Sequence, residues 1–253
     1  MPKKSTTTAA SSPPSPGEAR ERQQRGALKD PHLDTIPPVN AVVGASHRGI
    51  TGSFRVAIDG VLRTIATQRN MKIHVVAGLM VAVVGMALPL DLSVRVSLLF
   101  AVSIVFFAEI LNTALEALID LFVHDFHRLA MLAKDAAAGG VLVFAVTTVL
   151  VLGDILWTEW GTVISHPEAV LRSCVFGIPL AINEALGLFV VRRMGFNVVR
   201  LVVSGALLLP LVWHTADPIF AVVAVTLVAA AAAARLGYLP RHDGPRRPTV
   251  AGV

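Results

Sequence analysis

The segment Glu109–Asp120, EILNTALEALID, places polar side chains at regular intervals along one stretch of chain. Glu109, Asn112, Glu116 and Asp120 are separated by three, four and four residues, so a helix would carry all of them on one face. Carboxylates and an amide in this arrangement are suited to binding a metal ion and to transferring a proton. A structural polar patch between helices is the alternative interpretation.

A second polar group follows within a few residues. It contains Asp125 and His127 in a predicted short loop, and then Lys134 and Asp135 at the predicted start of the next helix. A lysine close to carboxylates that hold Mg²⁺ can neutralise the charge of a transferred phosphate. The two groups together predict a phosphoryl-transfer site at the cytoplasmic membrane surface. The sequence has no Walker loop and no kinase catalytic loop, so neither soluble nucleotide-binding architecture is predicted.

The elements that must position these residues are predicted to be membrane helices. Hydrophobic residues make up 54% of the chain and charged residues 15%, and the mean hydropathy is +0.67. Several runs approach the roughly 20 apolar residues that a helix needs to cross a bilayer. We therefore predict an all-α membrane protein with six spans, of which the fifth is short and contains Pro210: Ile73–Leu90, Val94–Ile119, Ala136–Leu156, Ala169–Val191, Leu201–Trp213 and Pro218–Leu236.

Residues 52–70 are predicted to form a different kind of helix. Apolar side chains recur there at helical spacing, while Arg55, Asp59 and Arg63 line the other side. Such an amphipathic helix is suited to lying in the plane of the membrane surface. It would act as a surface anchor, or as a wall beside a site at the membrane surface.

The charge distribution predicts the orientation of the spans. All but two of the 22 lysines and arginines, Arg95 and Arg172, fall on one side of the six predicted spans. By the positive-inside rule this side is cytoplasmic, and both termini lie there. Three tryptophans fall at the predicted outer boundary, where indole rings prefer to sit. The basic charge is thus explained by membrane orientation, and no nucleic-acid partner is predicted.

The chain outside the spans has a different composition. Residues 1–48 are rich in Ser, Thr, Pro and charge, which predicts a disordered cytoplasmic arm. We expect a membrane domain over residues 49–156, accessory transmembrane helices over 157–238 and a cytoplasmic tail over 239–253.

Several motifs in their order along the chain resemble a known family. Gly60, RNMKIH, EILNTALEALID, DFHRLA and AKDAAA are similar to the blocks of the prokaryotic diacylglycerol kinase and undecaprenol kinase family. The resemblance covers about residues 54–156. It implies an integral-membrane lipid kinase with a surface helix and a three-helix core, located in the bacterial cytoplasmic (inner) membrane. It also implies a homotrimer with active sites shared between neighbouring subunits.

The resemblance also implies a role for individual residues. Glu109 would be the general base that accepts the proton of the lipid hydroxyl, and Asn112 would help to orient that region. Glu116 would bind Mg²⁺, and Lys134 would contact the phosphates of ATP. Asp125, His127 and Asp135 would help to hold the nucleotide. His74, Ala138 and Asn112 would contact the lipid substrate.

Two features depart from the family pattern. The family has a second metal-binding glutamate on the surface helix, whereas this chain has Gln68, a neutral and weaker ligand for Mg²⁺. The half of the chain after Leu156 has no counterpart in the core family, and we expect it to form about three helices that pack on the kinase. Within this half, a pair between Arg172 and Glu184 is not expected, because twelve residues of helix separate them by roughly 18 Å.

Two other classes of function remain open at this stage. A small transporter or channel would use intramembrane acids as an ion path, and Glu184 alone favours it. A catalytically weakened, kinase-like scaffold is suggested by Gln68 and by the extra helices. The clustering of acids at one end, beside Lys134, favours ATP-dependent phosphorylation of diacylglycerol or undecaprenol.

Overall fold

The computed structural model describes residues 49–123, 125–190 and 194–237, and these residues are almost entirely helical. Within these ranges, six helical stretches are long and apolar enough to cross a membrane. They correspond to the six predicted spans, and the prediction of an all-α, multi-pass membrane protein is confirmed. The predicted arm over residues 1–48 and the tail over 239–253 lie outside the described residues.

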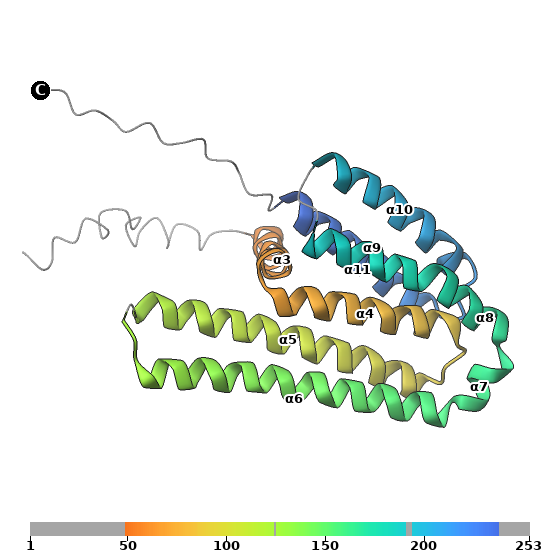
Figure 1. The fold of residues 1–253 in the computed structure, drawn as a ribbon, viewed down its shortest axis with the longest axis horizontal. Helices are drawn as coiled ribbons and strands as arrows, with labels where there is room; N and C mark the ends of the chain where they lie inside the picture. The colour runs from red at the N-terminus through yellow and green to blue at the C-terminus, as the bar shows by residue number, and fades with distance from the viewer. Residues whose placement is uncertain (1–48, 124, 191–193, 238–253) are drawn as a thin grey trace, which may run out of the picture. The chain divides into compact units, whose positions relative to one another are not determined.

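The first helix, α3 (Ile50–Thr67), is the predicted amphipathic helix. Most of its side chains are exposed, whereas Thr64 and Ile65 near its end are buried. At Gln68 the backbone is extended, with φ −86° and ψ 125°, and α4 (Arg69–Ala87) begins directly after it. The chain turns sharply at this point, so that Figure 1 shows α3 end-on while α4 lies across the view. The helix therefore ends three residues earlier than the predicted limit of 70.

The next two helices form a long hairpin. Helices α5 (Leu92–Phe122) and α6 (Arg128–Thr158) run antiparallel beside each other, and α5 lies next to α4 (Figure 1). Helix α6 begins at Arg128, eight residues before the predicted start at Ala136, because the helix extends beyond its apolar stretch. Lys134 and Asp135 thus lie in its second turn. Val141 is the only buried residue of α6 among the described part of the chain.

The second half of the chain supplies the remaining spans. Two short helices, α7 (Trp160–Ser165) and α8 (Pro167–Arg172), lead through a π-helical turn at Ser173–Gly177 into α9 (Ile178–Phe189). Helix α10 (Met194–Trp213) contains Pro210 and begins seven residues before the predicted start at Leu201. A proline is tolerated in a membrane helix when neighbouring groups satisfy the freed carbonyl. Helix α11 (Pro218–Gly237) completes the bundle.

These extra helices pack directly on α4, as predicted. A Cβ atom added to Gly85 of α4 would lie 2.4 Å from the ring of Phe220 of α11. A Cβ atom at Gly177 would likewise lie 2.4 Å from Cγ1 of Val83. Small residues at such positions let membrane helices approach each other closely. Helix α4 therefore lies in the interior, between the α5–α6 hairpin and the accessory helices.

An ion pair and several hydrogen bonds connect the loop before α11 to the neighbouring ends of α4 and α5. Nη1 of Arg95, in the first turn of α5, lies 2.6 Å from Oδ2 of Asp217, which precedes α11. The other oxygen of Asp217 accepts a hydrogen bond from the backbone N–H of Ile219 at 2.8 Å. The backbone N–H of Ala216 also donates to the carbonyl of Met86 at 2.8 Å. These contacts join the loop before α11 to the ends of α4 and α5.

Candidate active site

The polar face of α5 contains two buried members. Glu109 is 1% exposed and Asn112 is 4% exposed, whereas Glu116 is half-buried and Asp120 is exposed. Nδ2 of Asn112 donates a hydrogen bond to Oε1 of Glu116 at 2.9 Å. The structure therefore places the four residues on one face, in a gradient from the interior at Glu109 to the solvent at Asp120.

Oε2 of Glu109 and Oδ1 of Asn112 are buried and have no hydrogen-bond partner among the described residues. An unsatisfied buried polar group typically costs about 1–3 kcal/mol, and more when it is charged. Carboxylates in membrane helices are costly for the same reason and mark functional sites. Among the described residues, these two buried oxygens therefore remain able to accept a hydrogen bond.

Lys134 reaches this face from α6. Its Nζ forms an ion pair with Oδ1 of Asp120, which joins the second turn of α6 to the last part of α5. Both side chains are substantially exposed. Exposed ion pairs contribute little stability, about 0–1 kcal/mol, so Lys134 can exchange this partner for an anionic ligand at small cost. The sequence had predicted a phosphate contact for Lys134 but not its pairing with Asp120.

The other predicted nucleotide-binding residues lie at the same end of the hairpin. Asp125 and His127 occupy the link between α5 and α6, and Asp135 follows Lys134. All of them are exposed, as is Ala138 one turn further along α6. The structure therefore gathers these residues beside the exposed end of the polar face and leaves their side chains accessible to a ligand.

The side chains at the polar end of this face include oxygen donors that suit Mg²⁺. Among the described residues, no three His, Cys, Asp or Glu side chains gather around one possible metal position. Mg²⁺ in phosphoryl-transfer sites, however, is bound by one or two carboxylates together with substrate phosphates and water. Glu116 uses only Oε1 in its bond to Asn112, and Oδ1 of Asn112 has no partner in the described chain. This set fits an ion that arrives with a nucleotide. Gln68 stands at the hinge between α3 and α4 with its side chain half-buried.

An apolar cavity approaches the buried end of the face. It has a volume of about 230 Å³ and lies between α4, α5 and α6. His74, which is half-buried, lines it together with Val105, which precedes Glu109 by one turn on the same face of α5. Sequence reasoning missed this cavity, because it depends on how three helices pack. The residues that line it are Ile73, His74, Ala77, Gly78, Val81, Val102, Val105, Phe106, Ala145, Thr148 and Val149.

Comparison with known proteins identifies the class of this fold and site. The family model of prokaryotic diacylglycerol kinase matches residues 55–156. A diacylglycerol kinase of Synechocystis is 38% identical over 136 residues, which cover 47% of this chain and 78% of that protein. The undecaprenol kinase of Bacillus subtilis is 37% identical over 99 residues, which cover 39% of this chain and 80% of that protein. This chain belongs to the prokaryotic diacylglycerol kinase family.

A third relative is also a diacylglycerol kinase. The diacylglycerol kinase of Escherichia coli K12 is 35% identical over 86 residues, which cover 34% of this chain and 70% of that protein. No solved structure matches this chain. The family match begins within α3 and ends within α6, so the helices from α7 onward lie outside it. The polar face and the apolar cavity both fall inside the matched region.

Proposed function

We propose that this lipid kinase transfers the γ-phosphate of ATP to the hydroxyl of a membrane lipid alcohol, diacylglycerol or undecaprenol. One observation carries the proposal. The buried carboxylate of Glu109, with Oε2 unpartnered within the described chain, stands one turn from an apolar cavity and on the same face as half-buried and exposed polar groups. A lipid would approach this carboxylate from the apolar side, and a nucleotide would approach it from the polar side.

Glu109 is proposed as the general base. The cavity beside His74 would hold the apolar part of the acceptor, so that its hydroxyl reaches Oε2 of Glu109. Glu109 would take the hydroxyl proton while the lipid oxygen bonds to the γ-phosphorus and the bond from that phosphorus to the bridging oxygen of ADP breaks. Asn112, held by its bond to Glu116, would keep the polar face in order around the reacting hydroxyl.

The polar end of the face would bind the nucleotide. Glu116 would hold Mg²⁺, with Gln68 as a neutral second ligand, and the ion would supply charge neutralisation at the β- and γ-phosphates. Lys134 would leave Asp120 to contact the same phosphates. Asp125, His127 and Asp135 would hold the rest of the nucleotide from the link between α5 and α6 and from the second turn of α6.

The proposal also covers the membrane in which the protein lies and its oligomeric state. We infer that the protein lies in the bacterial cytoplasmic (inner) membrane with both termini cytoplasmic, as the distribution of lysine and arginine predicts. We also infer a homotrimer. Helix α6 supports this inference, because all its residues except Val141 are at least partly exposed in the single chain and remain available to lipid or to another copy.

The transporter interpretation loses its main support in the structure. Glu184 forms an ion pair with Arg235 at 2.6 Å, so it is neutralised within the accessory helices.

The decisive experiment for the function offers the purified full chain a panel of lipid alcohols with labelled ATP in mixed micelles. Label in phosphatidic acid or in undecaprenyl phosphate supports the proposal and identifies the acceptor. Label in neither, under conditions where a known family member is active, would refute it.

A further inference from the structure

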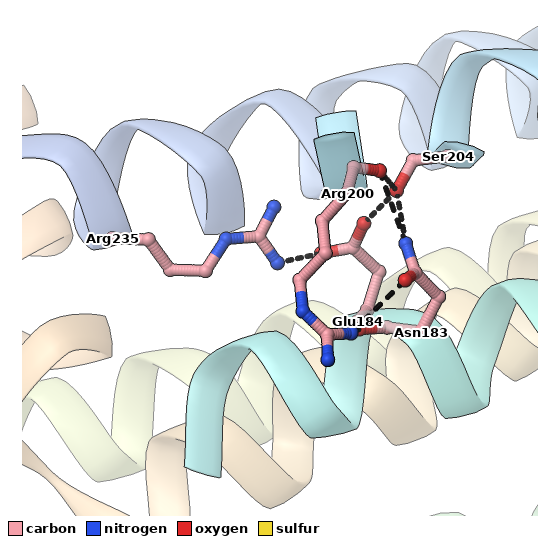
Figure 2. A network of polar contacts seen from close by, with 5 residues as sticks. All are labelled: Asn183, Glu184, Arg200, Ser204 and Arg235. Carbon is pink, nitrogen blue, oxygen red and sulfur yellow. Dashed lines mark hydrogen bonds and ion pairs between the residues drawn. The ribbon is translucent and has the colours of Figure 1, made fainter. Parts of the chain in front are cut away.

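A buried polar network occupies the accessory helices, outside the family match. Figure 2 shows Asn183 and Glu184 of α9, Arg200 and Ser204 of α10, and Arg235 of α11 pointing toward one another. Nη1 of Arg235 lies 2.6 Å from Oε2 of Glu184, and Ser204 donates its hydroxyl hydrogen to Oε1 of Glu184. Nη1 of Arg200 donates to the backbone oxygen and to Oδ1 of Asn183, both at 3.0 Å. We call these five residues the accessory network.

The accessory network has more positive than negative charge. It contains two guanidinium groups but one carboxylate, and that carboxylate is already paired with Arg235. Arg200 has only neutral hydrogen-bond partners in the described chain. An excess cation in an apolar bundle is costly unless an anion or water compensates it. Among the described residues, Arg200 therefore has no anionic partner.

Donor atoms in the accessory network and in the neighbouring Asn197 have no hydrogen-bond partner among the described residues. Nε and Nη2 of Arg235 and Nε of Arg200 are buried and have no hydrogen-bond partner among the described residues. Asn197 is 2% exposed, and both Nδ2 and Oδ1 of its side chain are buried without a partner in the same part of the chain. Asn197 precedes Arg200 by three residues and Ser204 by seven, so it lies on the same face of α10. Guanidinium and amide N–H groups are the donors that bind phosphate oxygens.

The backbone is shaped to hold one of these cations. Arg235 lies across Gly187 of α9, where an added Cβ atom would stand 2.3 Å from its Nη1. Gly187 follows Glu184 by three residues, so the same helix face supplies both the anion and the space for the cation. Arg200, in contrast, is only half-buried. The network is thus fixed at Arg235 and reaches the surface at Arg200.

The network lies at the end of the bundle where α3 meets α4. Leu188 of α9 and Ala234 of α11, each within four residues of the network, pack with Ile65 and Met71 in one buried cluster. Ile110 of α5, next to Glu109, packs against this cluster. The accessory network and the candidate active site therefore occupy the same end of the helices, on opposite sides of α4.

We propose that the accessory network binds the phosphate group of an anionic membrane lipid. The lipid phosphate would enter beside Arg200, accept hydrogen bonds from the free donors of Arg200, Arg235 and Asn197, and compensate the surplus charge. Its acyl chains would remain in the bilayer along the exposed apolar surface of α10, where Phe196, Val199 and Val203 are exposed. The site is independent of the proposed kinase reaction, because none of its residues belongs to the candidate active site.

The test measures lipid retention by the full chain in neutral detergent, without ATP or Mg²⁺. Native mass spectrometry would count bound dioleoyl phosphatidic acid, dioleoyl phosphatidylcholine and dioleoylglycerol, and melting temperatures would be recorded with each lipid and with inorganic phosphate. The variants are Arg200→Gln and Asn197→Leu. The control is Arg172→Gln, which removes a half-buried arginine outside the network, whose Nη2 donates to the carbonyl of His214.

We expect the wild-type chain and Arg172→Gln to retain one more phosphatidic acid than Arg200→Gln does. Asn197→Leu should melt at a higher temperature without lipid, because it removes an unpartnered amide, and should lose the increase that phosphatidic acid produces. Inorganic phosphate that raises the melting temperature and displaces the lipid would confirm the phosphate chemistry of the site. Equal retention by Arg200→Gln and the wild-type chain would overturn the proposal. An unchanged lipid effect in Asn197→Leu would also overturn it, and would show that the buried atoms are structural alone.

Discussion

Asn112 donates a hydrogen bond to Glu116 across one turn of α5, with Nδ2 and Oε1 2.9 Å apart. This bond occupies one oxygen of Glu116. It also fixes the amide, whose oxygen is buried and has no partner in the described chain. The pair therefore connects the buried end of the polar face with its solvent-exposed end.

Glu116→Ala should raise the Mg²⁺ concentration required for half-maximal activity. The change removes the only carboxylate proposed as a ligand, and even partners outside the ligand shell change metal affinity by roughly 10- to 100-fold. We expect a shift of at least about tenfold in a titration of initial rate against Mg²⁺. The matched control is Glu168→Ala, an exposed glutamate in the first turn of α8. Equal titrations for both variants would remove Glu116 from the metal site.

Lys134→Ala should raise the KM for ATP without a change in the KM for lipid. A hydrogen bond to a charged group contributes about 1.5–3 kcal/mol, which corresponds to roughly a ten- to hundredfold change. Asp120→Ala is the informative comparison, because Asp120 is the ion-pair partner of Lys134 in the structure. If Lys134 acts on phosphate, Asp120→Ala should leave the KM for ATP nearly unchanged. The same increase in both variants would mean that the ion pair matters only for structure.

Gln68→Glu should lower the Mg²⁺ requirement and leave turnover equal or higher. The substitution would add a charged oxygen at the hinge between α3 and α4, and Mg²⁺ prefers charged oxygen donors. The same titration of initial rate against Mg²⁺ measures the effect. Gln68→Asn serves as the control, since it keeps a neutral amide at this position. A titration that coincides with that of the wild-type chain would place Gln68 outside the metal site.

The polar face of α5 was predictable from sequence because the signal is local. A spacing of three and four residues fixes Glu109, Asn112 and Glu116 on one face wherever the helix lies. The spans were predictable for a similar reason, since length and apolar composition decide whether a helix can cross the bilayer. The twelve residues between Arg172 and Glu184 also correctly excluded an ion pair between them.

Contacts between distant segments were not predictable in this way. The partner of Glu184 is Arg235, which lies 51 residues further along the chain. The ion pair of Lys134 with Asp120 depends on the polar first turns of α6, which precede the apolar span predicted from Ala136. The break at Gln68 and the π-helical turn at Ser173–Gly177 depend on how helices pack. No single-helix pattern contains this information.

Gly85→Ala should destabilise the protein, although alanine favours a helix more than glycine does. The added methyl group would clash with the ring of Phe220, at 2.4 Å. Overpacking typically costs about 1–3 kcal/mol, against a gain of about 1 kcal/mol from helix propensity. Gly153→Ala is the control, because no atom lies within 4 Å of its added Cβ. Melting in detergent should show a lower temperature for Gly85→Ala and an equal or higher one for Gly153→Ala. The reverse order would contradict the packing of α11 on α4.

The central claim is that Glu109 removes the proton of a lipid hydroxyl. The most direct measurement is the initial rate of phosphate transfer from ATP to the accepted lipid by Glu109→Gln, beside the wild-type chain and Asp154→Asn. Asp154 is an exposed acid near the opposite end of the α5–α6 hairpin, so its change controls for the loss of a carboxylate. Loss of a positioned base typically lowers the rate by about 10²- to 10⁴-fold. We predict such a loss in Glu109→Gln, with unchanged expression and melting temperature, and a normal rate in Asp154→Asn. A Glu109→Gln variant that turns over at the wild-type rate would contradict the account.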